Sequence, residues 1–181
     1  MGLFDWFRAT PQRTEPSDQA FAALLVGHAL SAAEECMNRF LYEDNCEREE
    51  DGLLMYENLF TIYLALVFAY LREFDMRQYE DLIVNDLRRR FQGAGSAQTN
   101  LTVANIYHVR DHVHPPSRSH SFEELKSSWP LFIRAILEDY HRARFGKRTF
   151  LAIVDEGKTA NFLAEHVERV EAQCKNRAGR Q

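Results

Sequence analysis

The longest apolar run of this chain extends from Leu59 to Leu71 and is bracketed by Glu57 and Arg72. It is shorter than the roughly 20 residues that a membrane-spanning helix needs, so we do not expect it to cross a bilayer. A helix that is apolar on nearly all of its faces must be covered by neighbours on more than one side. The run therefore predicts a central helix, over about 53–74, inside a bundle of other helices.

Segments on both sides of this run repeat their apolar residues at steps of three and four, which is typical of amphipathic helices. Capping residues, prolines and glycines set the expected ends of these helices. The first expected helix runs from Asp18 to Tyr42, and another runs from Met76 to Gln92 with Asp75 as its cap. A short helix is expected after the Ser121–Glu124 capping box, followed by a longer one from Pro130 to Phe145. The last expected helix runs from Thr149 to Asn176, with a bend near Gly157. The sequence thus predicts an all-α, single-domain bundle of about five to seven helices.

The segment from Leu101 to Val113 fits two periods. Its apolar residues alternate as in a strand, and some of them also fit helical steps. We expect a helix. The alternative is a small β-ribbon with Phe150–Val154, the other β-prone run, because an isolated strand needs a partner.

The boundaries of the domain follow from composition. Residues 1–16 form an N-terminal extension whose aromatic cluster of Leu3, Phe4, Trp6 and Phe7 we expect to dock on the core. Residues 17–176 form the helical domain, and 177–181 form a tail that we expect to fray. A chain of 181 residues is long enough to bury its own core.

Cysteine usage and charge indicate the compartment and the class of partner. The three cysteines have no C-x-x-C spacing, and the N-terminus lacks the features of a secretory signal, so we expect a cytoplasmic protein. The net charge is −5, and the stretch 43–51 is strongly acidic. We expect this stretch to be a solvated loop or frayed helix end that binds a basic protein partner, and we regard nucleic acid as an unlikely ligand.

Histidines are concentrated between His108 and His114. His108 and His112 share one face whether the segment is helix or strand, because a separation of four suits both periods. Such a pair can bind a divalent metal with one or two further ligands, and Asp111, Glu138 and His141 are the candidates. Glu138 and His141 also match one E-x-x-H half-motif of di-iron bundles, but the chain has no second copy. Apart from this possible divalent metal, we expect no cofactor.

Arg110, Asp111 and His114 form a second constellation at the end of the same segment. Their order of Arg, polar residue and His resembles that of the helical HEPN ribonucleases, although three residues separate Arg110 from His114 where that family usually has four to six. The resemblance implies that the imidazole acts in acid–base cleavage of RNA while the guanidinium holds the phosphate. The spacing does not place the chain in that family.

No nucleophile elbow, Walker A loop or dinucleotide-binding turn occurs in the sequence. We therefore expect a non-enzymatic helical module that binds another protein. The alternatives are a metal-dependent helical enzyme that uses His108 and His112, and an RNA-cleaving bundle that uses Arg110 and His114. The oligomeric state does not follow from the sequence.

Overall fold

The computed structural model describes residues 17–42, 49–91, 96–117, 120–145 and 152–179. These residues contain six helices and no named strand, which confirms the all-α prediction. The helices are α1 (Asp18–Phe40), α2 (Glu49–Glu73), α3 (Gln78–Arg90), α4 (Ser96–Val113), α5 (Phe122–Phe145) and α6 (Glu156–Ala178). The predicted N-terminal extension with its aromatic cluster lies outside the described residues.

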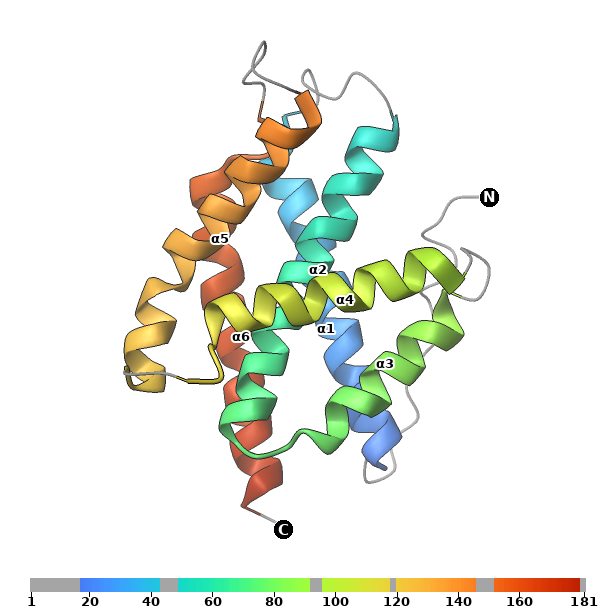
Figure 1. Cartoon of the computed structure of the whole chain (residues 1–181), viewed down its shortest axis with the longest axis vertical. Helices are drawn as coiled ribbons and strands as arrows, with labels where there is room; N and C mark the ends of the chain where they lie inside the picture. Colours follow the sequence, from blue (N-terminus) through green and yellow to red (C-terminus); the bar gives the residue numbers. More distant parts are fainter. Residues whose placement is uncertain (1–16, 43–48, 92–95, 118–119, 146–151, 180–181) are drawn as a thin grey trace.

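Helix α2 is the centre of the bundle, as the apolar run predicts. Every residue from Leu59 to Leu71 is buried. Helix α2 packs on α1, α3, α4 and α6, and Figure 1 shows α4 crossing α2 obliquely with α5 and α6 together on one side of it. Neighbours on several sides satisfy the requirement of a helix that is apolar all round.

Among the described residues, two helices meet the length and hydropathy of a membrane span, namely α1 and the Glu50–Glu73 part of α2. The more apolar of the two, α2, has most of its span buried inside this bundle. The core helix of a soluble protein meets the same criterion, so these features are weak evidence for a membrane location.

Helix α1 begins as the sequence predicts. The Ser17 hydroxyl accepts the Ala20 N–H and caps the helix at Asp18. The helix ends at Phe40, before the expected Tyr42, because the chain becomes extended and Leu41 forms an antiparallel bridge with Val154. The end of the β-prone run 150–154 therefore pairs with the end of α1, and the predicted alternative of a ribbon with 101–113 is wrong.

The expected role of Asp75 as the cap of α3 is also wrong. Asp75 has a φ of +55°. Its N–H bonds to the Arg72 carbonyl, and the Met76 N–H bonds to the Leu71 carbonyl at 2.7 Å. These two bonds form a Schellman motif, so Asp75 ends α2 and does not begin α3. Helix α3 starts at Gln78, and its preceding residue Arg77 makes no side-chain cap.

The acidic stretch 43–51 is only partly described. Residues 49–51 belong to the first turn of α2, and the Asp51 side chain is buried, so this part of the stretch is the start of a helix and not the solvated loop of the first alternative. Acidic residues in a first helical turn are favoured by the helix dipole. Residues 43–48 lie outside the described part of the chain.

Helices α4 and α5 are both longer than expected. The segment 101–113 is helical, as predicted, and α4 starts earlier, at Ser96. The capping box of α5 is present, since the Ser121 N–H donates to the Glu124 carboxylate and the Glu124 N–H donates to the Ser121 hydroxyl. Pro130 lies inside α5 and does not start a second helix, which corrects the prediction of a short helix followed by a longer one.

Helix α6 starts at Glu156, later than expected, with the Asp155 carboxylate accepting the Lys158 N–H as its cap. Gly157 lies in the first turn, so no bend occurs there. Helix α6 continues to Ala178, and Arg177 bonds to Asp18 and Tyr79. Residues 177 and 178 are therefore ordered parts of the bundle, which corrects their assignment to a frayed tail.

Candidate functional site

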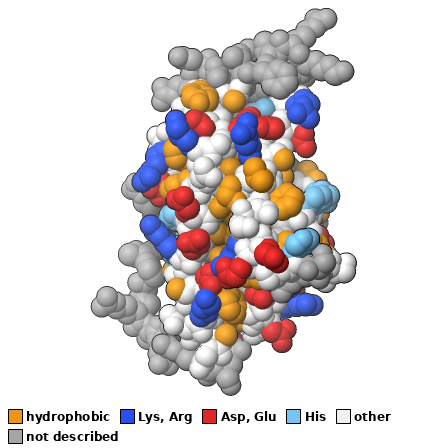
Figure 2. Space-filling view, turned by 90° about the vertical axis from the view of Figure 1, so that its left-hand side faces the viewer, with side chains coloured by type: hydrophobic (Ala, Val, Ile, Leu, Met, Phe, Trp, Pro, Cys, Tyr) orange, Lys and Arg blue, Asp and Glu red, His pale blue; other side chains and the backbone are white. Residues whose placement is uncertain are grey.

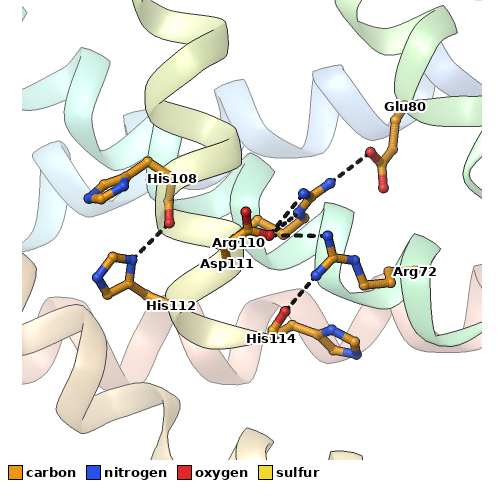
Figure 3. Close-up of polar contacts among 7 residues, drawn as sticks. All are labelled: Arg72, Glu80, His108, Arg110, Asp111, His112 and His114. Atoms are coloured by element: carbon orange, nitrogen blue, oxygen red, sulfur yellow. Dashed lines mark hydrogen bonds and ion pairs between the residues drawn. The ribbon is translucent and has the colours of Figure 1, made fainter. Parts of the chain in front are cut away.

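The rings of His108 and His112 are exposed and in contact on one side of α4. Their centroids are 4.5 Å apart, and their planes are inclined at 65°. Nδ1 of His112 lies 2.9 Å from the His108 carbonyl oxygen. Because a carbonyl only accepts, Nδ1 carries the proton, and the neutral ring keeps the lone pair on Nε2. Figure 3 shows both imidazoles on the side of α4 away from Arg72 and Glu80.

Two large apolar side chains of the next helix along the chain are also exposed. Leu131 is 73% exposed and Phe132 is 40% exposed on the neighbouring helix α5. The Trp129 indole N–H donates to the Val113 carbonyl, so the turn of α5 before Leu131 contacts α4 one residue after His112. Leu131 and Phe132 follow this turn: Phe132 lies on the same side of α5 as Trp129, and Leu131 points to the opposite, solvent-facing side.

Phe132 lies one turn after Trp129, which bonds to α4, and on the opposite side of α5 from His141, which bonds to Glu156 at the start of α6. Leu101, 55% exposed, lies two turns before His108 on the same edge of α4. We call these five exposed residues the α4–α5 surface: Leu101, His108, His112, Leu131 and Phe132.

Arg110, a predicted catalytic residue, points to the other side of α4. Its Nη1 donates to Oε2 of Glu80 at 3.0 Å, and its Nη2 donates to Oδ1 of Asp111 at 2.9 Å. The guanidinium also lies over the Tyr107 ring, 4.7 Å from its centroid. Arg72 of α2 donates to the same Asp111 oxygen at 3.1 Å, so the network joins α2, α3 and α4 (Figure 3).

The carboxylates of this network have opposite pKa shifts. Burial raises the pKa of Glu80, and the charges of Arg110 and Arg72 only partly offset that rise. Oε1 of Glu80 has no hydrogen-bond partner among the described residues. At Asp111 burial acts in the same direction, but hydrogen bonds and charges from Arg110 and Arg72 bring the net pKa below its usual value. Asp111 is therefore the ionised partner of two arginines.

His114, the other predicted catalytic residue, is buried at the end of α4. Its carbonyl accepts a hydrogen bond from Nη1 of Arg72 at 2.7 Å, and its Nε2 lies 3.4 Å from Oε2 of Glu73. The ring also packs on Phe122, with centroids 5.4 Å apart. The structure thus brings Arg110 and His114 into one half-buried network that ties the end of α4 to α2.

Glu138 and His141 do not approach the histidine pair of α4. Glu138 pairs with Arg134 one turn earlier on α5. His141 is buried, its Nδ1 lies 2.5 Å from Oε1 of Glu156, and its Nε2 accepts the Ile153 N–H at 3.1 Å. Both ring nitrogens are therefore engaged in holding the start of α6 against α5.

Of the predicted metal ligands, the structure brings together His108 and His112. Asp111 faces the arginines, and Glu138 and His141 lie at separate places on α5. In the described part of the chain, no group of three or more His, Cys, Asp or Glu side chains is placed to hold a metal.

Several residues at these sites escaped the sequence reasoning. Glu80 and Glu156 look like ordinary solvated acids in the sequence, and only the packing of α3 and α6 brings them to Arg110 and His141. Phe132 occupies a helical stripe with Ile136 and Tyr140 in the sequence, which favours burial, yet it is exposed. Leu131 lies one position outside that stripe. A large apolar residue outside the buried stripe of a helix is the sequence signal that could have indicated an exposed apolar surface on α5.

Comparison with protein-family models, curated proteins and solved structures finds no match to this chain.

Proposed function

We propose that this chain is a non-enzymatic helical module that binds another protein, and that the partner docks with apolar side chains on the α4–α5 surface. The observation that carries the proposal is the exposure of Leu131 and Phe132 on a helix that has already buried its other face. That buried face comprises Phe122, Leu125, Trp129, Ile133 and Leu137. The exposed pair is therefore surplus to the core of this chain.

The free energy available at this surface is substantial. Burying a Leu or Phe side chain contributes about 1.5 to 3 kcal/mol, so each such side chain that becomes fully buried accounts for roughly a tenfold to hundredfold change in affinity. Single exposed apolar residues are common on protein surfaces. Leu131 and Phe132 are two consecutive large apolar side chains that are both exposed, which is what favours docking here.

The charges around the surface fit an apolar partner. On α5, Arg134 pairs with Glu138 and Asp139 pairs with Arg142. Figure 2, which shows the face that carries α5 and α6, has acidic and basic side chains intermixed, with hydrophobic ones between them. A surface whose charges are already paired gives little attraction to a strongly charged partner, and hydrophobic burial then dominates binding.

The contacts of Arg110 and His114 support this proposal over RNA cleavage. A phosphate at Arg110 would compete with Glu80 and Asp111 for the same guanidinium, and leaving the buried Glu80 without its partner costs free energy. The two residues are better placed to hold α2, α3 and α4 together than to contact a polymer.

Site-specific crosslinking tests the proposal. A photo-reactive amino acid in place of Leu131, in the full chain expressed in its own cells, is expected to give one discrete crosslinked product, identified by mass spectrometry. The matched control carries the same amino acid at Ala172, an exposed position on α6.

The affinity of the identified protein for the purified chain then tests whether the partner docks on the α4–α5 surface. A Leu131→Asp, Phe132→Asp double variant that still folds is expected to bind at least about tenfold more weakly, because these side chains would be the buried centre of the contact. An Ala172→Asp variant keeps the parent affinity. Equal binding by the double variant, or the same product from both crosslinker positions, would show that the partner docks elsewhere.

A further inference from the structure

We propose that the partner on the α4–α5 surface is a second copy of this chain, and that one zinc ion held by His108 and His112 of both copies joins them. This inference rests on the proposed function, because it uses the same surface for binding. It adds the identity of the partner and a requirement for metal.

The geometry of the histidine pair fits a shared ion. With metal–nitrogen bonds of about 2 Å, each ring centre lies about 3 Å from the ion, so two rings that bind it at roughly 90° to 110° have centres roughly 4.5 to 5 Å apart. The observed separation of the His108 and His112 centroids is 4.5 Å. The spacing of the two rings is therefore compatible with chelation of one ion.

The tautomer of His112 supports the same reading. Metal-binding histidines usually donate their other ring N–H to a carbonyl or carboxylate, which fixes the ring and leaves the second nitrogen as ligand. His112 makes this contact through Nδ1 to the His108 carbonyl, so its Nε2 is the ligand atom. Both rings are exposed, and an ion reaches them without opening the fold.

The site is incomplete within the described part of one chain. Zinc in structural sites takes four ligands in tetrahedral geometry, and the described residues bring no third His, Cys, Asp or Glu into a group with this pair. A two-fold contact is self-complementary, so a second copy presents an identical pair at the symmetry axis. Two imidazoles from each copy then complete the four-ligand shell.

The surroundings explain why association would depend on the metal. Phe132, on the α4 side of α5, would be covered in a contact that forms at the pair, which adds hydrophobic free energy. Each copy has a net charge of −5, so two copies repel at long range. A divalent cation at the contact offsets part of that repulsion. Zinc and apolar burial together are therefore expected to hold a dimer that neither supports alone.

The test uses the full chain without a histidine tag, in sedimentation and native mass spectrometry. In EDTA the chain is expected to be a monomer. On addition of zinc chloride the mass is expected to double, with one zinc per two chains. His108→Ala and His112→Ala are each expected to abolish the dimer. His120→Ala, which removes an exposed histidine outside the α4–α5 surface, leaves it unchanged.

A Phe132→Asp variant separates this inference from the proposed function. One contrary outcome is a parent dimer in EDTA that Phe132→Asp prevents and that His108→Ala and His112→Ala do not. In that case the surface binds a second copy without zinc, and the metal inference is overturned. One zinc per monomer without a doubled mass also overturns it, as does the absence of zinc binding. In either of these cases a protein captured at Leu131 by crosslinking still supports the proposed function.

Discussion

The Arg110 guanidinium lies 3.0 Å from the Glu80 carboxylate between α3 and α4, and both side chains are almost fully buried, with 12% and 9% exposed. Burying the Glu80 carboxylate costs free energy, and the charge of Arg110 beside it offsets part of that cost. The pair thus has a structural use that is independent of any catalytic role for Arg110.

Arg110→Met is expected to destabilise the fold by about 3 kcal/mol at pH 8, because it leaves the buried Glu80 carboxylate without its partner. The raised pKa of Glu80 makes the loss smaller at pH 5, where the carboxyl takes up a proton more easily. Urea denaturation of Arg110→Met, Glu80→Gln and the double variant measures the coupling between the two residues. If the two single losses simply add, the pair contributes no coupling energy.

Asp75 adopts a backbone conformation that costs an ordinary L residue about 1 kcal/mol. Asp75→Gly is expected to stabilise the protein by a few tenths to 1 kcal/mol, because glycine adopts this conformation without strain. Asp75→Val is expected to destabilise it, since a β-branched side chain is the least tolerant of a positive φ. Thermal unfolding of the two variants should therefore shift in opposite directions, and a downward shift for both would contradict the assigned turn.

His28 and His166 are expected to make the bundle acid-sensitive. Burial lowers the pKa of both side chains below 6.5, and the Arg169 charge lowers it further. The unfolded chain then binds protons more readily than the folded one, so stability present above pH 6.5 is lost as the pH falls through the folded pKa values. In a His28→Gln, His166→Gln double variant that folds, the free energy of unfolding should change less between pH 7 and pH 5 than in the parent. An identical pH profile would remove these two histidines as the cause.

His141 is expected to be the histidine whose loss costs most stability. It is buried, and its Nε2 accepts the Ile153 N–H. His141→Ala therefore leaves a buried N–H unsatisfied and opens a cavity, with an expected loss of about 2 to 4 kcal/mol. The neighbouring Arg142→Ala, at an exposed position, should change the free energy of unfolding by less than about 0.5 kcal/mol. Equal effects of the two substitutions in urea denaturation would contradict the assigned contacts.

The central helix was predictable because its evidence is local. Thirteen residues from Leu59 to Leu71, apolar apart from Thr61, need cover on all sides whichever helices provide it. The helical choice for 101–113 and the caps at Ser17 and Ser121 succeeded for the same reason, since each depends on a few neighbouring residues.

Other predictions failed for two reasons. Either one local signal was given too much weight against another, or the structure of a residue depends on contacts with residues far away in the sequence. The acids of 49–51 repel one another, but they also favour the start of a helix, and the helix begins there. Asp75 has a side chain suited to a cap, yet the end of α2 uses its backbone. The burial of His141 depends on Ile153 and Glu156, which only the reversal of the chain after α5 brings to it.

Asp18 and Arg177, separated by 159 positions in the sequence, are bonded to one another at the end of the bundle where α1 begins and α6 ends (Figure 1). The first and last helices are therefore neighbours, and the bridge of Leu41 with Val154 joins them again at the other end of α1. During synthesis on the ribosome, α1 remains without this neighbour until α6 has been made. We expect a nascent chain that stops before α6 to expose the uncovered face of α1 to chaperones and proteases, and the bundle to close only once α6 has emerged.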